Sequence, residues 1–312
     1  MSEKVYLVFD IETAVIPYES FSASQQEYLV RGAVTEEEIE RKKAEMGLTP
    51  LTAQVATIGM KIVPFSQLEK EEEKLYELLN EEIYAVRDSK EEYIDAENYD
   101  DTNPEKNENN ISKTSDSLMD YSISQDILYD KNRESIESVT KNVALMLNPD
   151  LTDDDEPIIT IQDDKTFYET SEKRLLETFW KTVDKYKGCV LMSFNGRNFD
   201  APFLMIRSAL LKVKPTRNLM EGTKFNYPQH IDLIDELTFY SPSGYGATKR
   251  YNFDFYTRAF GLVSPKSEGI DGSLVSVFFR EGKYKTIADY CLRDVDATWK
   301  LFLRIKNYLT IK

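Results

Sequence analysis

The stretch KVYLVFDIET, residues 4–13, combines a short apolar run with two acids at its end. Its β-branched and aromatic residues predict a buried strand over residues 4–9. Side chains alternate along a strand, so Asp10 and Glu12 are expected to project from one face while Ile11 is buried on the other. Two carboxylates on one face at a strand end can share a hard cation, although an Asp-x-Glu pair alone is a weak signal.

A second segment, SFNGRNFDAPFL at residues 193–204, contains a turn and the start of a helix. Asn195 and Gly196 follow a predicted strand and form the turn. A helix begins near Asp200, because the proline two residues later is tolerated only in a first turn. Asp200 is then either a first-turn acid that stabilises this helix, or a ligand that points across the sheet end toward Asp10.

A third segment, YCLRD, lies in a helix predicted over residues 284–308. Its Tyr290 and Asp294 are four residues apart and therefore share one helix face. Alone, they are either a tyrosine at the core margin beside a surface acid, or two members of a site. Asp289 and Asp296 fall on other faces of the helix and are excluded from the candidate site.

Strands alternate with helices along the rest of the chain. This alternation predicts an α/β fold with a mixed central sheet and helices on both faces. Thr35 and Glu38 have capping-box spacing at the start of a helix that Gly47 ends. Further strands are expected at residues 55–63, 158–162 and 189–194, and further helices at residues 66–84 and 172–187.

Residues 86–157 form an acidic segment with 20 Asp and Glu against 7 Lys and Arg. High charge and sparse apolar content favour a flexible surface insertion. Within it, residues 134–147 could still form a helix. We therefore expect one domain built from residues 1–85 and 158–312, interrupted by this insertion.

The charge and cysteine content bound the function. The net charge of −16 is unusual for a protein that handles polyanions, but most of it belongs to the insertion. Cys189 and Cys291 lie in apolar surroundings, and no Cys/His cluster suggests structural zinc or a disulfide framework. The sequence shows no signal peptide and no run long enough to span a membrane, so we expect a cytoplasmic protein. His230 is interpreted as a structural histidine, and Asp232 as a weaker carboxylate candidate.

The three segments are much more specific together than separately. They resemble the three exonuclease motifs of the DEDD superfamily of 3′→5′ exonucleases, and a tyrosine four residues before the last aspartate marks its DEDDy branch. The chain resembles in particular the bacterial predicted exonucleases related to the proofreading domain of family B DNA polymerases. HIDLIDEL at 230–237 and PKSEGIDGSLV at 265–275 support this resemblance, which covers roughly residues 1–65 and 158–312. The motif residues are Asp10-x-Glu12, Asn195-x-x-x-Phe199-Asp200 and Tyr290-x-x-x-Asp294.

The resemblance implies a ribonuclease-H-like fold and hydrolysis at the 3′ end of single-stranded DNA. It implies that Asp10, Glu12, Asp200 and Asp294 hold two divalent cations, and oxygen ligands favour Mg²⁺ or Mn²⁺ over zinc. Tyr290 would orient the attacking water, because a phenol is a poor general base at neutral pH. Asn195 is a further, substrate-binding candidate. The long separation between the first two motifs departs from the superfamily, but surface insertions can absorb it because loop length costs little stability.

Two alternatives stay open at this point. One is an exoribonuclease that trims RNA ends, since the motifs do not separate RNA from DNA. The other is a non-catalytic scaffold that binds nucleic acid or a partner, with the acidic insertion as a possible protein-docking segment. Several cations and one aromatic near the motifs could contact a nucleic-acid strand, but are interpreted as ordinary surface residues: Arg197, Lys249, Arg250, Tyr251 and Lys266.

Overall fold

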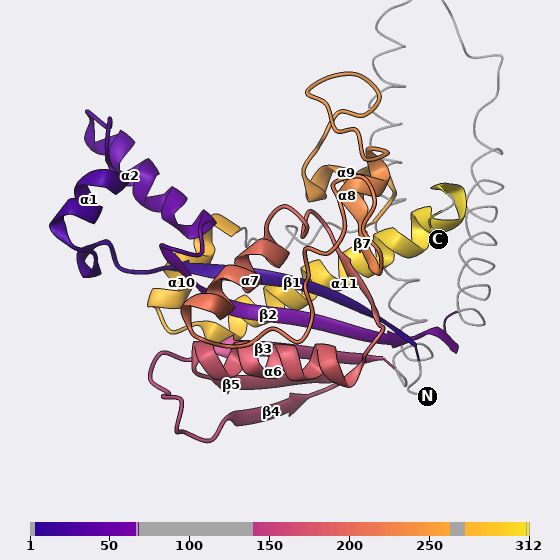
Figure 1. Cartoon of the computed structure of the whole chain (residues 1–312), viewed down its shortest axis with the longest axis horizontal. Coiled ribbons are helices and arrows are strands. Elements are labelled where there is room, and N and C mark those ends of the chain that lie inside the picture. The colour runs from indigo at the N-terminus through magenta and orange to yellow at the C-terminus, as the bar shows by residue number, and fades with distance from the viewer. Residues whose placement is uncertain (1–3, 67, 69–139, 263–271, 310, 312) are drawn as a thin grey trace, which may run out of the picture.

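The computed structural model describes residues 4–66, 68, 140–262, 272–309 and 311. A seven-stranded sheet lies at its centre, in the order β4-β5-β3-β2-β1-β6-β7 (Figure 1). The strands are β1 (Val5–Val15), β2 (Ala53–Pro64), β3 (Lys141–Leu147), β4 (Ile158–Gln162), β5 (Lys165–Thr170), β6 (Val190–Ser193) and β7 (His230–Asp232).

The sheet is mixed in direction. Strand β2 is antiparallel to both of its neighbours, β1 and β3. On one side β6 runs parallel to β1, and β7 parallel to β6. On the other side β5 runs parallel to β3, and β4 pairs with β5 as an antiparallel edge strand. The two longest strands, β1 and β2, are therefore central.

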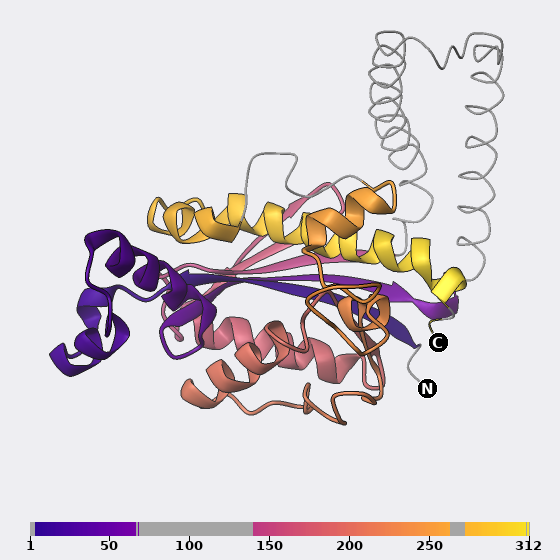
Figure 2. The same cartoon turned by 90° about the horizontal axis from the view of Figure 1, so that it is seen from above.

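Helices cover both faces of the sheet (Figure 2). The long helix α11 lies on one face, and α6 and α7 lie on the other. The helices are α1 (Ala23–Leu29), α2 (Glu36–Glu45), α6 (Glu172–Lys185), α7 (Asp200–Leu210), α8 (Leu233–Leu237), α9 (Phe253–Ala259), α10 (Val275–Arg280) and α11 (Tyr284–Leu309), with 3-10 turns η1 (Tyr18–Ser20), η2 (Met46–Leu48) and η5 (Gly272–Leu274). The predicted α/β, ribonuclease-H-like fold is confirmed.

Alternation along β1 decides which helix each of its residues meets. Phe9 and Ile11 are buried in the cluster that contains Phe179 of α6. Val8 is buried in the other cluster, with Trp299 of α11. Even-numbered positions of β1 thus face α11, and the two acids that follow Val8 at even positions face it as well.

The structure corrects one expectation about the predicted insertion. Residues 141–147, which we considered as part of a helix, form β3 between β2 and β5. Because β3 is covered by α6 and α11, its apolar run VALML lacks the alternation typical of a half-buried strand. The following residues up to 157 connect β3 to β4. The remainder of the predicted insertion, and nearly all of the helix predicted at 66–84, lie outside the described residues, so the division into domain and insertion stays a prediction.

Several helix boundaries agree with the sequence analysis. The capping box of α2 is present: the Thr35 hydroxyl accepts the amide N–H of Glu38, whose carboxylate accepts the amide N–H of Thr35. Helix α6 begins after Ser171, and α11 spans the predicted range. Helices α1 and α2 contain no buried residue and project from the end of the sheet (Figure 1). Among the described helices, none has the length and apolar character needed to cross a membrane.

Candidate metal centre

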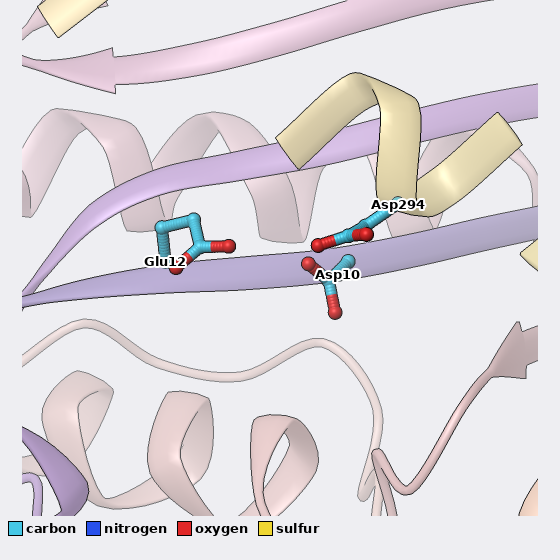
Figure 3. A group of neighbouring side chains, drawn as sticks. All are labelled: Asp10, Glu12 and Asp294. Carbon is cyan, nitrogen blue, oxygen red and sulfur yellow. The ribbon is translucent and has the colours of Figure 1, made fainter. Parts of the chain in front are cut away.

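Three carboxylates from two distant parts of the chain meet between β1 and α11. Asp10 and Glu12 come from β1, and Asp294 comes from α11. Each offers an oxygen atom, and these oxygens all lie within 4.8 Å of one another. Figure 3 shows the three side chains gathered in the same space beside β1. This spacing suits a single cation held by all three groups.

The close approach of α11 to the sheet depends on a glycine. Gly59 of β2 pairs directly with Asp10 of β1. A Cβ atom at Gly59 would lie 2.9 Å from Sγ of Cys291 and 3.3 Å from its carbonyl carbon, so a side chain there would push α11 away. One turn of the helix separates Cys291 from Asp294. Gly59 therefore allows the contact that brings Asp294 to β1, and no local pattern in the sequence marks it.

Asp200 lies beside the three carboxylates and is held by β1 itself. It is the first residue of α7, and its Oδ1 atom accepts the backbone N–H of Ile11 at 2.9 Å. Its side chain is buried, with 3% exposure. Asp200 therefore opens the helix and is also bonded across the sheet end to β1, while its role as a ligand stays a prediction. It is not among the three carboxylates that share the 4.8 Å spacing.

The carboxylates raise one another's pKa values. Burial is the largest cause of the raised pKa of Asp10, followed by the charges of Asp200 and Asp294. The pKa of Glu12 is raised by burial and then by the same two charges. Burial is also the main cause that raises the pKa of Asp200 to about 7, against its hydrogen bond from Ile11. A bound divalent cation would relieve this repulsion, so the donor set fits Mg²⁺ or Mn²⁺.

Two residues of α11 support the cluster. Tyr290 is buried, and its pKa is raised by burial, by the charge of Asp294 and by a hydrogen bond with that carboxylate. The phenol therefore keeps its proton at neutral pH. Cys291, which the sequence analysis treated only as a core residue, lies with Sγ 3.4 Å from the backbone oxygen of Asp10 and 3.7 Å from its Oδ2. The thiol is a weak donor to the carboxylate that stands at the centre of the cluster.

The loop between β6 and α7 is fixed by Asp232. This carboxylate accepts the amide N–H of Asn195 at 2.6 Å and that of Arg197 at 2.8 Å, and it caps α8 through Ile234. It is buried, and burial raises its pKa to about 7. Asp232 is thus placed as a support of the loop and not in the carboxylate cluster. Asn195 has a positive φ of 66°, which its turn requires.

Gly196 is the second tight point of this loop. A Cβ atom there would lie 2.3 Å from Oγ of Ser193 and 3.3 Å from Oδ2 of Asp200. The loop therefore has no room for a side chain beside the Asp200 carboxylate. Ser193 in turn bonds to Nε2 of His230 at 2.8 Å. His230 is buried, and burial lowers its pKa to about 3, so it is neutral, in agreement with the structural role expected for it.

Comparison with known protein families finds a match. The family model for predicted 3′-5′ exonucleases related to the exonuclease domain of PolB matches residues 138–310, which is more than half of the chain. The matched segment contains Asp200, Tyr290 and Asp294, whereas Asp10 and Glu12 lie before it. No curated protein matches the chain. The fold brings Asp10 and Glu12, which lie outside the matched segment, close to Asp294, which lies inside it.

Proposed function

Because the chain belongs to this family of predicted 3′-5′ exonucleases, we propose that it removes nucleotides from the 3′ end of single-stranded DNA with the help of two divalent cations. The observation that carries the proposal is the meeting of Asp10 and Glu12, from outside the matched segment, with Asp294 from inside it, within 4.8 Å. Carboxylates this close repel one another, and bound cations would offset that repulsion. A chain with the family fold but without the activity would not need to keep these acids together.

Four carboxylates would hold the cations. Asp10, Glu12 and Asp294 would bind one cation together, which their spacing supports. Asp10 and, more loosely, Asp200 would bind the second, and Asp200 would use Oδ2 because Oδ1 accepts the N–H of Ile11. When bound, such cations lower the pKa of a water and stabilise negative charge on the leaving oxygen. Oxygen-only ligands favour Mg²⁺ or Mn²⁺.

Tyr290 would position the attacking water. Its hydroxyl is engaged with Asp294, and its raised pKa keeps the phenol protonated. The hydroxyl can donate to the carboxylate while its oxygen accepts a hydrogen bond from the water, which fixes the orientation of that water. A phenol with a raised pKa cannot act as the general base at neutral pH. Tyr290→Phe should therefore slow cleavage without removing the cations.

Digestion of labelled strands tests the proposal. Single-stranded DNA and RNA of one sequence, labelled at the 5′ end, are incubated with the full chain and Mg²⁺ or Mn²⁺. We expect a DNA ladder that shortens from the 3′ end, and no ladder with Asp10→Ala or with EDTA. Asp289→Ala is the matched control, because Asp289 lies on the same helix as Asp294 but pairs with Lys165 and Lys285.

The remaining outcomes separate the alternatives. A ladder on RNA alone would make the protein an exoribonuclease. If neither strand is cut although calorimetry detects bound Mn²⁺, the protein is a scaffold and the proposal is wrong. Normal cleavage by Asp10→Ala would remove the carboxylate cluster from the mechanism altogether.

A further inference from the structure

Two aromatic rings are stacked on each other at the surface near the start of α9. The rings of Tyr251 and Phe255 lie 4.2 Å apart between centroids and are almost parallel, at 11°. Tyr251 is 37% exposed and Phe255 is 52% exposed. These rings stack on each other at the surface and are not buried in the core. The exposed face of such a pair can stack on a further aromatic ring.

A chain of partly buried aromatic residues links this pair to the end of β6. Tyr251 meets Tyr256 edge-on at 6.1 Å, and Tyr256 packs against Phe194 at 5.8 Å. Phe253 of the same helix packs against Phe194 at 4.6 Å. Phe194 is the residue that precedes Asn195. The exposed rings are therefore connected, through aromatic packing, to the loop that precedes Asp200.

Two cations accompany the rings. Nζ of Lys249 lies 4.8 Å from the centre of the Tyr251 ring. Arg250 donates from Nη2 to the side-chain oxygen of Asn195. Both cations are exposed. In a chain with a net charge of −16, neighbouring cations and exposed rings beside an acidic centre match the charge and shape of a polyanion with flat bases.

We propose that Lys249, Arg250, Tyr251 and Phe255 form a stacking platform for the unpaired bases upstream of the 3′ end that lies at the carboxylate cluster. The proposal rests on the proposed function and identifies how the strand is held. The rings take a base by stacking, and the cations lie beside its phosphates. Stacking does not distinguish sugars, so the platform would accept a DNA or an RNA strand. From the sequence alone, three of these four residues are expected to be ordinary surface residues.

The Arg250–Asn195 contact explains why the platform belongs to this centre. Asn195 is anchored through its backbone to Asp232, and Arg250 is bound to the Asn195 side chain. A strand that passes over Arg250 is thereby led to the loop that opens α7 at Asp200. Arg250→Ala should remove one phosphate contact, and it should weaken binding most at low salt.

Binding to an inactive form tests the platform directly. The full chain with Asp10→Asn is titrated against a short fluorescein-labelled single-stranded oligonucleotide in Mg²⁺. We expect an added Phe255→Ala to raise Kd about tenfold, and Phe255→Trp to keep it near the starting value. A strand whose upstream bases are replaced by abasic sites should bind equally well with and without the Phe255→Ala change, because it offers nothing to stack.

Tyr28→Ala is the matched control. Tyr28 is 68% exposed and has a cation, Arg31, 5.1 Å from its ring centre. It lies on α1, which is far from α9 in both views (Figures 1 and 2). Its removal should leave Kd unchanged. An equal loss of binding in both variants would mean that exposed aromatics act non-specifically, and would overturn the platform.

A cleavage assay separates this proposal from the proposed function. Thymidine 5′-phosphate p-nitrophenyl ester has no upstream base, so Phe255→Ala in the active chain should hydrolyse it at the wild-type rate while KM for the oligonucleotide rises about tenfold. Equal slowing of both substrates would give Phe255 a structural role and overturn the platform. If the wild type cleaves neither, the proposed function fails and the titration still decides the platform. Unchanged Kd in Phe255→Ala overturns the platform whether or not cleavage occurs.

Discussion

Asp294 and Asp296 are two residues apart on α11, yet they lie in opposite electrostatic environments. Asp294 faces Asp10 and Glu12, and one oxygen atom from each of the three carboxylates lies within 4.8 Å of the other two. Asp296 lies between two lysines, with Lys61 at 2.5 Å and Lys300 at 3.1 Å. Burial raises the pKa of Asp296, but the two lysines outweigh it and leave the pKa well below its usual range.

The difference shows how the electrostatics of a candidate metal centre differ from those of an ion pair. Around Asp296 the protein supplies the positive charge itself, so that the carboxylate is neutralised by Lys61 and Lys300. Around Asp294 the charges that act most on Asp10 and Glu12 are those of other carboxylates. The cluster of Asp10, Glu12 and Asp294 can be neutralised by protons or by cations from solution. It is therefore suited to bind a metal.

The largest expected effect is on cleavage. Asp294→Asn removes a proposed metal ligand and should lower the rate of digestion by about 10³-fold or more. Asp296→Asn, its matched control on the same helix, should cut at nearly the wild-type rate. Initial rates on a 5′-labelled strand at saturating Mg²⁺ measure both. More than a tenth of wild-type activity in Asp294→Asn would contradict the assignment.

The second expected effect is on the free energy of unfolding, which Asp296→Asn should lower more than Asp294→Asn. Asp296→Asn leaves Lys61 buried, with its side chain only 7% exposed, and without the carboxylate that neutralises it. The cost should be about 2 kcal/mol, below that of a fully buried pair because the Asp296 side chain is 25% exposed. Asp294→Asn should keep or raise the free energy of unfolding in EDTA, since it removes repulsion. Urea unfolding monitored by circular dichroism tests both, and a greater loss in Asp294→Asn would refute the comparison.

A third effect concerns the distance between Asp294 on α11 and the two acids on β1. Gly59→Ala places a Cβ atom 2.9 Å from Sγ of Cys291, so α11 has to move away from β2. We expect a loss of about 1 to 2 kcal/mol in unfolding free energy and weaker Mn²⁺ binding by calorimetry. Gly244→Ala is the control, because a Cβ atom there would meet nothing within 4 Å. Unchanged Mn²⁺ affinity in Gly59→Ala would separate the glycine from the centre.

The smallest effect is a pH dependence of the metal-free protein. The folded-state pKa of Asp200 is raised, mainly by burial, to about 7 from an ordinary value of 3.8. Protonated Asp200 therefore contributes stability that is complete below the ordinary value and is lost as the pH rises through about 7. In EDTA, titration of Asp200 alone should lower the unfolding free energy by about 1 kcal/mol from pH 6 to pH 8. Asp200→Asn should remove this contribution and leave that of Asp232, whose pKa burial also raises to about 7, so an unchanged slope in the variant would contradict the assignment.

The sequence predicted the parts of the site that depend on local periodicity. Alternation along β1 put Asp10 and Glu12 on one face, and the helical repeat put Tyr290 and Asp294 on one face. These relations hold whatever surrounds the element. The first-turn proline likewise located the start of α7 at Asp200.

The features that were not predicted depend on contacts between elements. Strand β3 was interpreted as a possible helix, because its apolar run is buried on both sides and has neither period. Gly59 acquires its importance only from the Cys291 side chain on a helix far along the chain. The contact between Arg250 and Asn195 is equally non-local. No periodicity marks any of these positions in advance.

The centre joins an early strand to a late helix, and this has a consequence for synthesis. Asp10 lies in β1, whereas Asp294 lies in α11, which the ribosome makes after all the other described helices and strands. A growing chain therefore exposes the β1 acids long before their partner exists. On the proposed function, a nascent or prematurely terminated chain is inactive toward single-stranded DNA. Activity begins only when α11 has been made and has docked on the sheet.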